Sequence, residues 1–351
     1  MNKTGVKSGA SSGERAQSAI ANVVDGANDA APNQTRFSIS QLLSGTKGPL
    51  VGLLLLALGL TFSTDTFFTL RNLLNVMDQI TVLGILAIGM TLVILIGGID
   101  LSVGSILALG TMVLGFVSHK DYMNLPLPIG MVAALAVGAT CGLVSGLLIT
   151  IAKLPPFIAT LAMMSVARGL ANLITDGSQI VGFQDWFTYL SITRHFGFLS
   201  VTVAVMLVLT AAFAVFLVYR PNGRNLYAIG GGPDVARLSG IPVNRLTNIV
   251  YMLCGALAAL AGVVLAARLD SVQPSSGVGY ELDTIAAVVI GGASLSGGVG
   301  SMGGTVVGVL IIGVLRNGLN LLQVSPFIQQ IIIGVVIALA VSTDTLKRRA
   351  K

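Results

Sequence analysis

The sequence GGIDLSVGS, residues 97–105, places three glycines and one carboxylate between two long apolar runs, residues 82–96 and 106–117. A related stretch, GGASLSGG at residues 291–298, also lies between apolar runs. Glycine costs about 1 kcal/mol in a helix interior, so helices that only pack against one another have no use for it here. Membrane transporters, in contrast, build substrate paths from broken helices that line a cavity. We predict that both stretches are non-helical breaks that face a translocation path, with the path residues Gly97, Gly98, Asp100, Ser102, Gly104, Gly291, Gly292, Ser294 and Ser296.

The composition places the chain in a membrane. Of its 351 residues, 54% are hydrophobic and only 10% are charged, whereas a soluble domain carries about 25% charged residues. These charges are too few to cover a water-facing surface, so we expect an all-α integral membrane protein. Cys141 and Cys254 lie inside apolar runs, which favours packing roles over a disulfide. The net charge of +6 comes from cations at the ends of apolar runs, which the positive-inside rule explains better than nucleic-acid binding does.

Ten apolar segments follow a polar N-terminal stretch. Residues 1–46 are rich in Gly, Ser, Ala and Asn, so we predict a disordered cytoplasmic tail rather than a signal peptide. A transmembrane domain is predicted over residues 47–346 and a basic C-terminal tail over residues 347–351. The third and eighth segments are shorter than the about 20 residues that a spanning helix needs, so they are candidate half-helices. The segments are about 49–66, 78–97, 101–118, 127–151, 156–175, 198–219, 246–267, 281–294, 303–322 and 327–344.

The distribution of cations predicts the orientation. Lys and Arg precede the first segment, follow the fourth and sixth, and end the chain. Placing these clusters inside gives cytoplasmic termini and an even number of spans, about ten. The loop at residues 176–197 then lies outside, and its aromatic residues suit a short stretch at the membrane interface. Segments running inward lead to both glycine stretches, so residues 88–109 and 289–310 are either an internal repeat or two stretches of similar composition.

Several familiar chemistries are excluded. Residues 298–303, GVGSMG, spell the dinucleotide-binding fingerprint, but no soluble strand precedes them and no acidic residue follows at about 20 residues, so we interpret them as a membrane turn. His119 and His195 have no partners at metal-ligand spacing. The sequence holds no Walker loop and no catalytic triad that the apolar runs could assemble. We therefore expect no enzymatic activity, metal or cofactor in this chain.

Asp100 has two interpretations that do not exclude each other. A carboxylate deep in a bilayer costs at least about 2.5 kcal/mol, so it should face water, backbone amides or a cation. It could cap the third segment by accepting from that segment's first free amides, or it could line the cavity. We expect no second acidic residue in the central apolar runs that would form a proton or ion relay with Asp100. This argues against an ion-coupled carrier.

The longest cytoplasmic connection, residues 220–246, contains the pattern of a short capped helix. Gly232 can cap it, Pro233 fits its first position, and Gly240 ends it. A helix of barely two turns is marginal alone, so we expect it to pack against another surface. Docking to a partner is favoured over lying on the lipid surface, because its apolar residues share one face while Arg237 lies on another.

The chain resembles the membrane subunits of bacterial ATP-binding-cassette importers, in the branch that takes up ribose, xylose, galactose and related sugars. The resemblance spans about residue 50 to the C-terminus and rests on residues 89–104, 153–161, 223–241 and 290–298. The family usually has Gly-Gly-Asn before its cytoplasmic coupling helix, whereas this chain has three glycines, Gly230, Gly231 and Gly232. That departure leaves the fold assignment intact but alters how the helix is capped. The long N-terminal stretch is also not a family feature.

The resemblance implies a division of labour. A periplasmic sugar-binding protein delivers a neutral monosaccharide or polyol, two membrane subunits (identical or paralogous) form the path, and a separate cytoplasmic ATPase drives the cycle. An ion-coupled secondary transporter of a small polar solute is the alternative; it would show intramembrane charge pairs and no docking helix. The location implied is the inner membrane of a bacterium. The residues implied to couple to the ATPase are Gly230, Gly231, Asp234, Ala236, Arg237, Leu238 and Gly240.

Overall fold

The computed structural model describes residues 47–349. The predicted disordered tail, residues 1–46, and the last two residues of the predicted basic tail lie outside the described residues. The helices are α3 (Lys47–Ser63), α4 (Leu70–Leu95), α5 (Val103–Ser118), α6 (Leu127–Thr150), α7 (Pro156–Leu173), α8 (Asp185–Ile192), α9 (Val201–Tyr219), α10 (Pro221–Gly231), α11 (Pro233–Leu238), α12 (Val243–Leu269), α13 (Tyr280–Ile290), α14 (Met302–Leu321) and α15 (Pro326–Arg349). The strands are β1 (Ile180–Val181), β2 (Arg194–His195), β3 (Leu199–Ser200) and β4 (Ser271–Val272).

The described part of the chain is mostly helical and suited to a membrane. Six of its helices, α4, α6, α7, α9, α12 and α14, are long and apolar enough to cross a bilayer. Shorter apolar stretches form α3, α5 and part of α15. The two predicted half-helices are short, because α5 has 16 residues and α13 has 11. The all-α membrane class is therefore confirmed, while the count of about ten spans stays a prediction.

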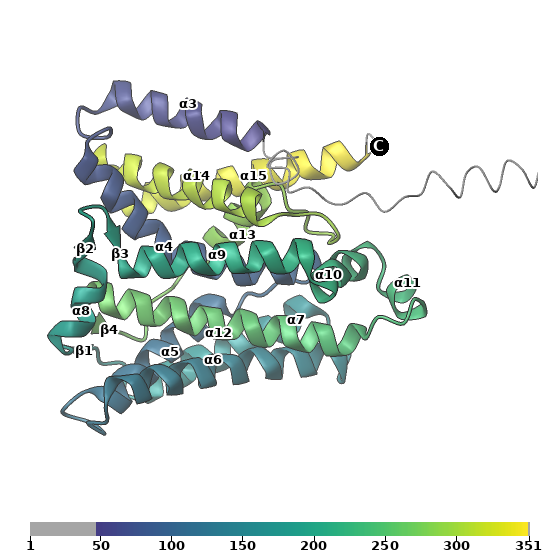
Figure 1. Cartoon of the computed structure of the whole chain (residues 1–351), viewed down its shortest axis with the longest axis horizontal. Coiled ribbons are helices and arrows are strands. Elements are labelled where there is room, and N and C mark those ends of the chain that lie inside the picture. Colours follow the sequence, from purple (N-terminus) through teal and green to yellow (C-terminus); the bar gives the residue numbers. More distant parts are fainter. Residues whose placement is uncertain (1–46, 350–351) are drawn as a thin grey trace, which may run out of the picture. The chain divides into compact units, whose positions relative to one another are not determined.

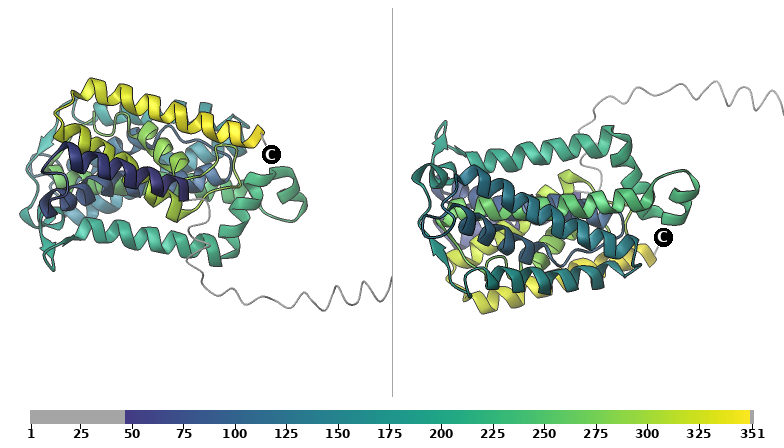
Figure 2. Two further views of the ribbon diagram at one scale, coloured as in Figure 1. Left: turned by 90° about the horizontal axis from the view of Figure 1, so that it is seen from above. Right: turned by 90° about the horizontal axis from the view of Figure 1, so that it is seen from below.

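The helices lie side by side, with different elements gathered at their two ends (Figure 1). One end, here called the strand end, carries α8 and the short strands, in which β1 pairs with β4 and β2 with β3. The other end, here called the α11 end, carries α10 and α11. Helix α3 begins, and helix α15 ends, on the side of the bundle toward the α11 end. Figure 2 shows α9 and α15 on opposite sides of the bundle.

Two central helices supply the largest share of the core. Helix α4 is buried along most of its apolar length, and α12 packs against α4, α5 and α6. The outer helices instead expose large apolar side chains, such as Val132 of α6 at 67% and Val208 of α9 at 67%. An outward-facing apolar surface of this kind suits contact with lipid rather than water.

Helices α6 and α12 approach closely because small residues line their contact. On α6, glycines recur every four residues, and a Cβ on Gly138 or Gly142 would overlap the backbone of α12. The reverse holds at Gly255 of α12, whose added Cβ would overlap the carbonyl oxygen of Gly138. Membrane helices commonly associate through such stripes, since van der Waals packing replaces the hydrophobic effect in lipid. Cys141 and Cys254 lie near this contact and both are free.

We expect Gly142→Val to destabilise the protein, because the added carbons overlap the backbone of Tyr251. Overpacking of this kind costs about 1–3 kcal/mol. The matched control is Gly169→Val on the membrane helix α7, where a Cβ meets nothing within 4 Å. Unfolding of the purified protein in detergent measures both, and equal stability of the two variants would contradict close α6–α12 packing.

Candidate functional site

Both glycine stretches interrupt helices, as predicted, but with different limits. The first break covers residues 96–102, between α4 and α5. Gly104 and Ser105 belong to α5, so the prediction that the break extends to residue 105 was wrong. The second break covers residues 291–301 and ends where the Ser301 side chain caps α14 by accepting from Gly304 N. Residues 291–296 form turns, whereas residues 90–95, aligned with them in the suspected repeat, are helical up to Leu95.

The two breaks and α10 meet at a contact between backbones, here called the glycine junction (Gly97, Gly230, Gly297 and Gly298). Gly298 N donates to the carbonyl oxygen of Leu95 at 2.9 Å, which ties the second break to the end of α4. A Cβ on Gly297 would lie 2.8 Å from Gly97 N and 2.9 Å from Gly230 Cα. A Cβ on Gly230 would overlap both Leu95 O and Gly298 N. The three chain segments therefore approach to a distance that only glycine permits.

A side chain of α10 reinforces the junction. Tyr227 lies one turn before Gly230 in α10. Its hydroxyl donates to the carbonyl oxygen of Gly300 at 3.1 Å. Burial raises the pKa of the Tyr227 phenol, since the anion is disfavoured away from water, so the hydroxyl keeps its proton and stays a donor. Helix α10 thus contacts the second break through a side chain, and its backbone contacts the second break and the end of α4.

Helix α11 has the caps that the sequence predicts. It begins at Pro233 after Gly232, and it ends before Gly240, which has a φ of +81°. Gly240 N donates to Arg237 O and Ile241 N to Ala236 O, both at 3.0 Å, which closes the C-terminus in the Schellman manner. Asp234 and Arg237 form an exposed ion pair at 2.8 Å.

The exposure pattern of α11 separates its two faces. Val235 is 69% exposed and Leu238 is 90% exposed, whereas Ala236 is 3% exposed and packs against the rest of the chain. An added Cβ at Gly231 would meet no atom within 4 Å. The α11 end therefore presents two large apolar side chains with nothing covering them in the described structure.

Asp100 does not cap α5. One oxygen of its carboxylate, Oδ1, accepts from the backbone nitrogen of Ser102 at 2.9 Å and from its hydroxyl at 2.5 Å. Ser102 precedes the helix, so the predicted bonds to the first amides of α5 were wrong; this is a local turn between Asp100 and Ser102. The Asp100 side chain is fully buried near Tyr251 and Cys254 of α12, and among the described residues its second oxygen has no donor stronger than the weak Cys254 thiol.

Most of the predicted path residues are buried in this structure. Three glycines pack against other backbones or side chains: Gly98 faces the Tyr251 hydroxyl, Gly104 faces Gly277, and Gly291 faces Gly304. The predicted path residues that are exposed are Gly97, Gly292 and Ser296, and the buried ones are Gly98, Asp100, Ser102, Gly104, Gly291 and Ser294.

Charged residues lie inside the bundle where none was expected. After β4 the chain turns back between the helices, and Arg168 of α7 donates to the carbonyl oxygens of Pro274 and Ser276. Helix α13 consequently begins inside the bundle and carries the buried Asp283, which pairs with Arg316 of α14. The expectation that Asp100 is the only acidic residue in the central runs was therefore wrong. Arg316 lies in the middle of a long apolar run, and this position in the sequence could have indicated a buried acidic partner.

The described residues contain no cluster of three or more His, Cys, Asp or Glu side chains that could hold a metal ion. The geometry instead favours mechanical transmission, since α10 and both breaks share one rigid contact at the α11 end.

We expect Gly230→Ala to destabilise the protein by about 1–3 kcal/mol, because its methyl group overlaps Leu95 O and Gly298 N. The neighbouring Gly231→Ala is the matched control: it adds the same methyl group to open space on the same helix. Helix propensity alone favours both alanines. Thermal unfolding of the purified variants separates the effects, and a Gly230→Ala protein as stable as Gly231→Ala would refute the junction.

Comparison with known proteins identifies the family. Residues 72–341 match the family model described as the branched-chain amino acid transport system / permease component. The ribose import permease of Escherichia coli strain K12 is 46% identical over 317 residues, covering 89% of this chain and 97% of that protein. The L-arabinose transport system permease of the same strain is 38% identical, covering 87% and 92% respectively. The galactose/methyl galactoside import permease of Haemophilus influenzae is 35% identical, covering 85% and 94%.

No solved structure matches the chain. The family match extends over more than three quarters of the sequence, and it includes both breaks, the glycine junction and α11. The sugar permeases align over nearly their whole lengths, so the likeness is not confined to a shared membrane helix pattern. The chain therefore belongs to the permease family of ATP-binding-cassette importers, in the branch that includes the ribose, arabinose and galactose permeases.

Proposed function

We propose that this chain is the transmembrane subunit of an importer that passes a neutral monosaccharide or polyol across the inner membrane of a bacterium. A periplasmic binding protein delivers the sugar, a second membrane subunit completes the path, and a separate ATPase supplies the energy. The observation that carries the proposal is the near full-length identity to permeases named for ribose, arabinose and galactose. The family description names branched-chain amino acids, so an amino acid is the competing substrate.

The proposed topology has ten spans with both termini in the cytoplasm. Its support is that helix α3 begins, and helix α15 ends, on the side of the bundle toward the α11 end (Figure 1). The cationic loop at residues 220–246 lies at the same end, which the positive-inside rule assigns to the cytoplasm. The strand end then faces the binding protein.

In the proposed mechanism, α11 docks in a cleft of the ATPase and α10 carries its movement to the membrane. The support is the exposed apolar pair Val235 and Leu238, together with the contact of Gly230 against the end of α4 and the second break. Shifting a transporter almost completely from one of its two conformations to the other requires a free-energy difference of about 5.5 kcal/mol. Closure of the two ATP-bound nucleotide domains of the ATPase can deliver this energy through a rigid contact. Of the predicted path residues, Gly97, Gly292 and Ser296 are exposed, and we propose that these three face the path.

We predict that Val235→Asp and Leu238→Asp abolish sugar uptake and co-purification with the ATPase while membrane insertion stays normal. A charge replaces an apolar contact that becomes buried in the complex. Ala236 is a poorer test, because it is buried within this chain and its replacement disturbs the loop itself. The control is Val181→Asp, a similarly exposed valine on β1 at the strand end. Full co-purification of both α11 variants would exclude this docking surface.

We predict that vesicles need all three components for uptake. The chain, its ATPase and its loaded binding protein should import labelled D-ribose, L-arabinose or D-galactose with ATP, but not labelled leucine. The isolated chain should import none of these under a proton or sodium gradient. Gradient-driven uptake by the isolated chain would overturn the importer, and uptake of leucine in place of the sugars would assign the substrate to the amino acids.

A further inference from the structure

A polar cavity of about 290 Å³ lies between α4, α12, α13 and α14. Its polar lining consists of Gln79, Arg268, Tyr280, Asp283, Arg316 and Asn320. Arg268 and Asn320 belong to the last turn of their helices at the strand end, whereas Tyr280 and Asp283 begin α13 inside the bundle. The cavity therefore occupies the half of the bundle nearer the strand end, away from the glycine junction.

Several hydrogen-bonding groups of this cavity are unused. The amide of Gln79 and the hydroxyl of Tyr280, both on half-buried side chains, have no hydrogen bond to another described residue. Arg268 makes only a long contact, 3.4 Å, to the carbonyl oxygen of Asp78. Polar groups that are free in a cavity can bond to water or to a ligand, so a ligand with matching hydroxyls can replace water there without losing hydrogen bonds.

The ion pair at the floor of the cavity is not itself free. Asp283 is 3% exposed and pairs with Nη2 of Arg316, which holds the guanidinium group in place. Fixed donors and acceptors of this kind bind a ligand without paying the entropy of ordering long side chains. The side-chain groups together supply both donors and acceptors, which is the requirement of a ligand that carries several hydroxyls.

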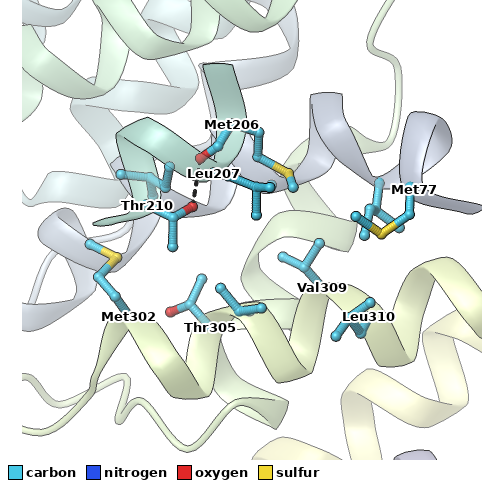
Figure 3. A pocket seen from close by; sticks show the side chains of 12 residues that line it. Met77, Met206, Leu207, Thr210, Met302, Thr305, Val309 and Leu310 are labelled. Atoms are coloured by element: carbon cyan, nitrogen blue, oxygen red, sulfur yellow. Dashed lines mark hydrogen bonds between the residues drawn. The ribbon is translucent and has the colours of Figure 1, made fainter. Parts of the chain in front are cut away.

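A second cavity provides the contrast. It has a volume of about 240 Å³, lies between α4, α9 and α14, and is surrounded by Met77, Met206 and Met302 (Figure 3). Its two hydroxyls are already bonded: Thr210 donates to Met206 O at 2.8 Å, and Thr305 contacts Thr91 at 2.7 Å. A sugar placed there would lose its hydrogen bonds to water and gain none.

We propose that the polar cavity is the first sugar-binding station inside the permease, reached from the strand end before the breaks at the α11 end open. This inference rests on the proposed function and adds the residues that hold the substrate. Gln79 and Tyr280 bond to sugar hydroxyls through their free amide and phenol groups, Arg268 and Arg316 donate, and the ring of Tyr280 offers an apolar face to the C–H groups of the sugar.

The test uses the complete transporter in vesicles, at saturating sugar-loaded binding protein, with whichever of labelled D-ribose, L-arabinose or D-galactose the wild type imports fastest. Gln79→Leu and Tyr280→Phe each remove one hydrogen-bonding group at nearly constant volume. We expect each to lower the maximal uptake rate about fivefold to tenfold, the loss that corresponds to one hydrogen bond. ATP hydrolysis without sugar should remain within about twofold of the wild type, since α11 and the junction are untouched.

The matched controls make the same chemical changes elsewhere. Gln330→Leu lies on the exposed surface of α15, and Tyr122→Phe lies in the loop after α5; both should import at the wild-type rate. A second measurement places a cysteine at Gln79 in a Cys141→Ala background and follows its reaction with a small water-soluble thiol reagent. Sugar-loaded binding protein with the ATPase should slow this reaction, whereas empty binding protein should not.

The outcomes separate the two proposals. If Gln79→Leu and Tyr280→Phe import sugar at the rate of the wild type, the proposal that the cavity binds sugar is wrong, while the proposed importer function still holds. Reduced uptake with equally reduced sugar-free ATP hydrolysis would also overturn the cavity proposal, because the residues would then be structural. A wild-type transporter that imports none of the three sugars would overturn both.

Discussion

The backbone contact among Gly97, Gly230 and Gly297 constrains the rest of the structure. No Cβ fits at Gly230 or Gly297 without displacing another main chain, so α10 and the two breaks cannot move independently over small distances. Packed contacts of this kind change between two discrete arrangements and do not deform continuously. A displacement of α10 must therefore carry both breaks with it or separate the junction, and either event changes the backbone next to the end of α4 and the start of α14.

The surroundings of the junction suit a contact that has to change. Asp100, five residues after the end of α4, is buried with no donor to its second oxygen stronger than the nearby Cys254 thiol, and the nearby Tyr251 hydroxyl is unpaired. Unsatisfied buried polar groups raise the energy of the conformation that contains them. The conformation described here is therefore not the one in which every group around the first break is satisfied. A movement that admitted water or brought a donor to Asp100 would recover this energy.

Local patterns were predictable from the sequence, whereas contacts between distant segments were not. The caps of α11 follow from Gly232, Pro233 and Gly240, which act within a few residues. The junction joins glycines separated by more than 60 residues, and a single sequence gives no sign of which glycines meet. Asp283 was overlooked because it lies at the start of the eighth apolar segment, where charged residues were assumed to lie outside the membrane. In the structure the chain re-enters the bundle before α13, so Asp283 lies inside it. Asp100 was assigned to a cap because the start of α5 was placed two residues too early.

The charges inside the bundle also bear on the energy source. An ion-coupled carrier needs an acidic group that gains and loses a proton or cation as the path opens. Asp283 is bound to Arg316, the carboxylate of Glu281 accepts from Gly279 N, and Arg168 is bound to the carbonyl oxygens of the re-entrant segment. These groups hold α7, α13 and α14 together, and breaking a buried pair leaves an uncompensated charge that costs several kcal/mol. They are thus suited to fix the half of the bundle nearer the strand end, while the uncharged junction at the other end is free to transmit movement.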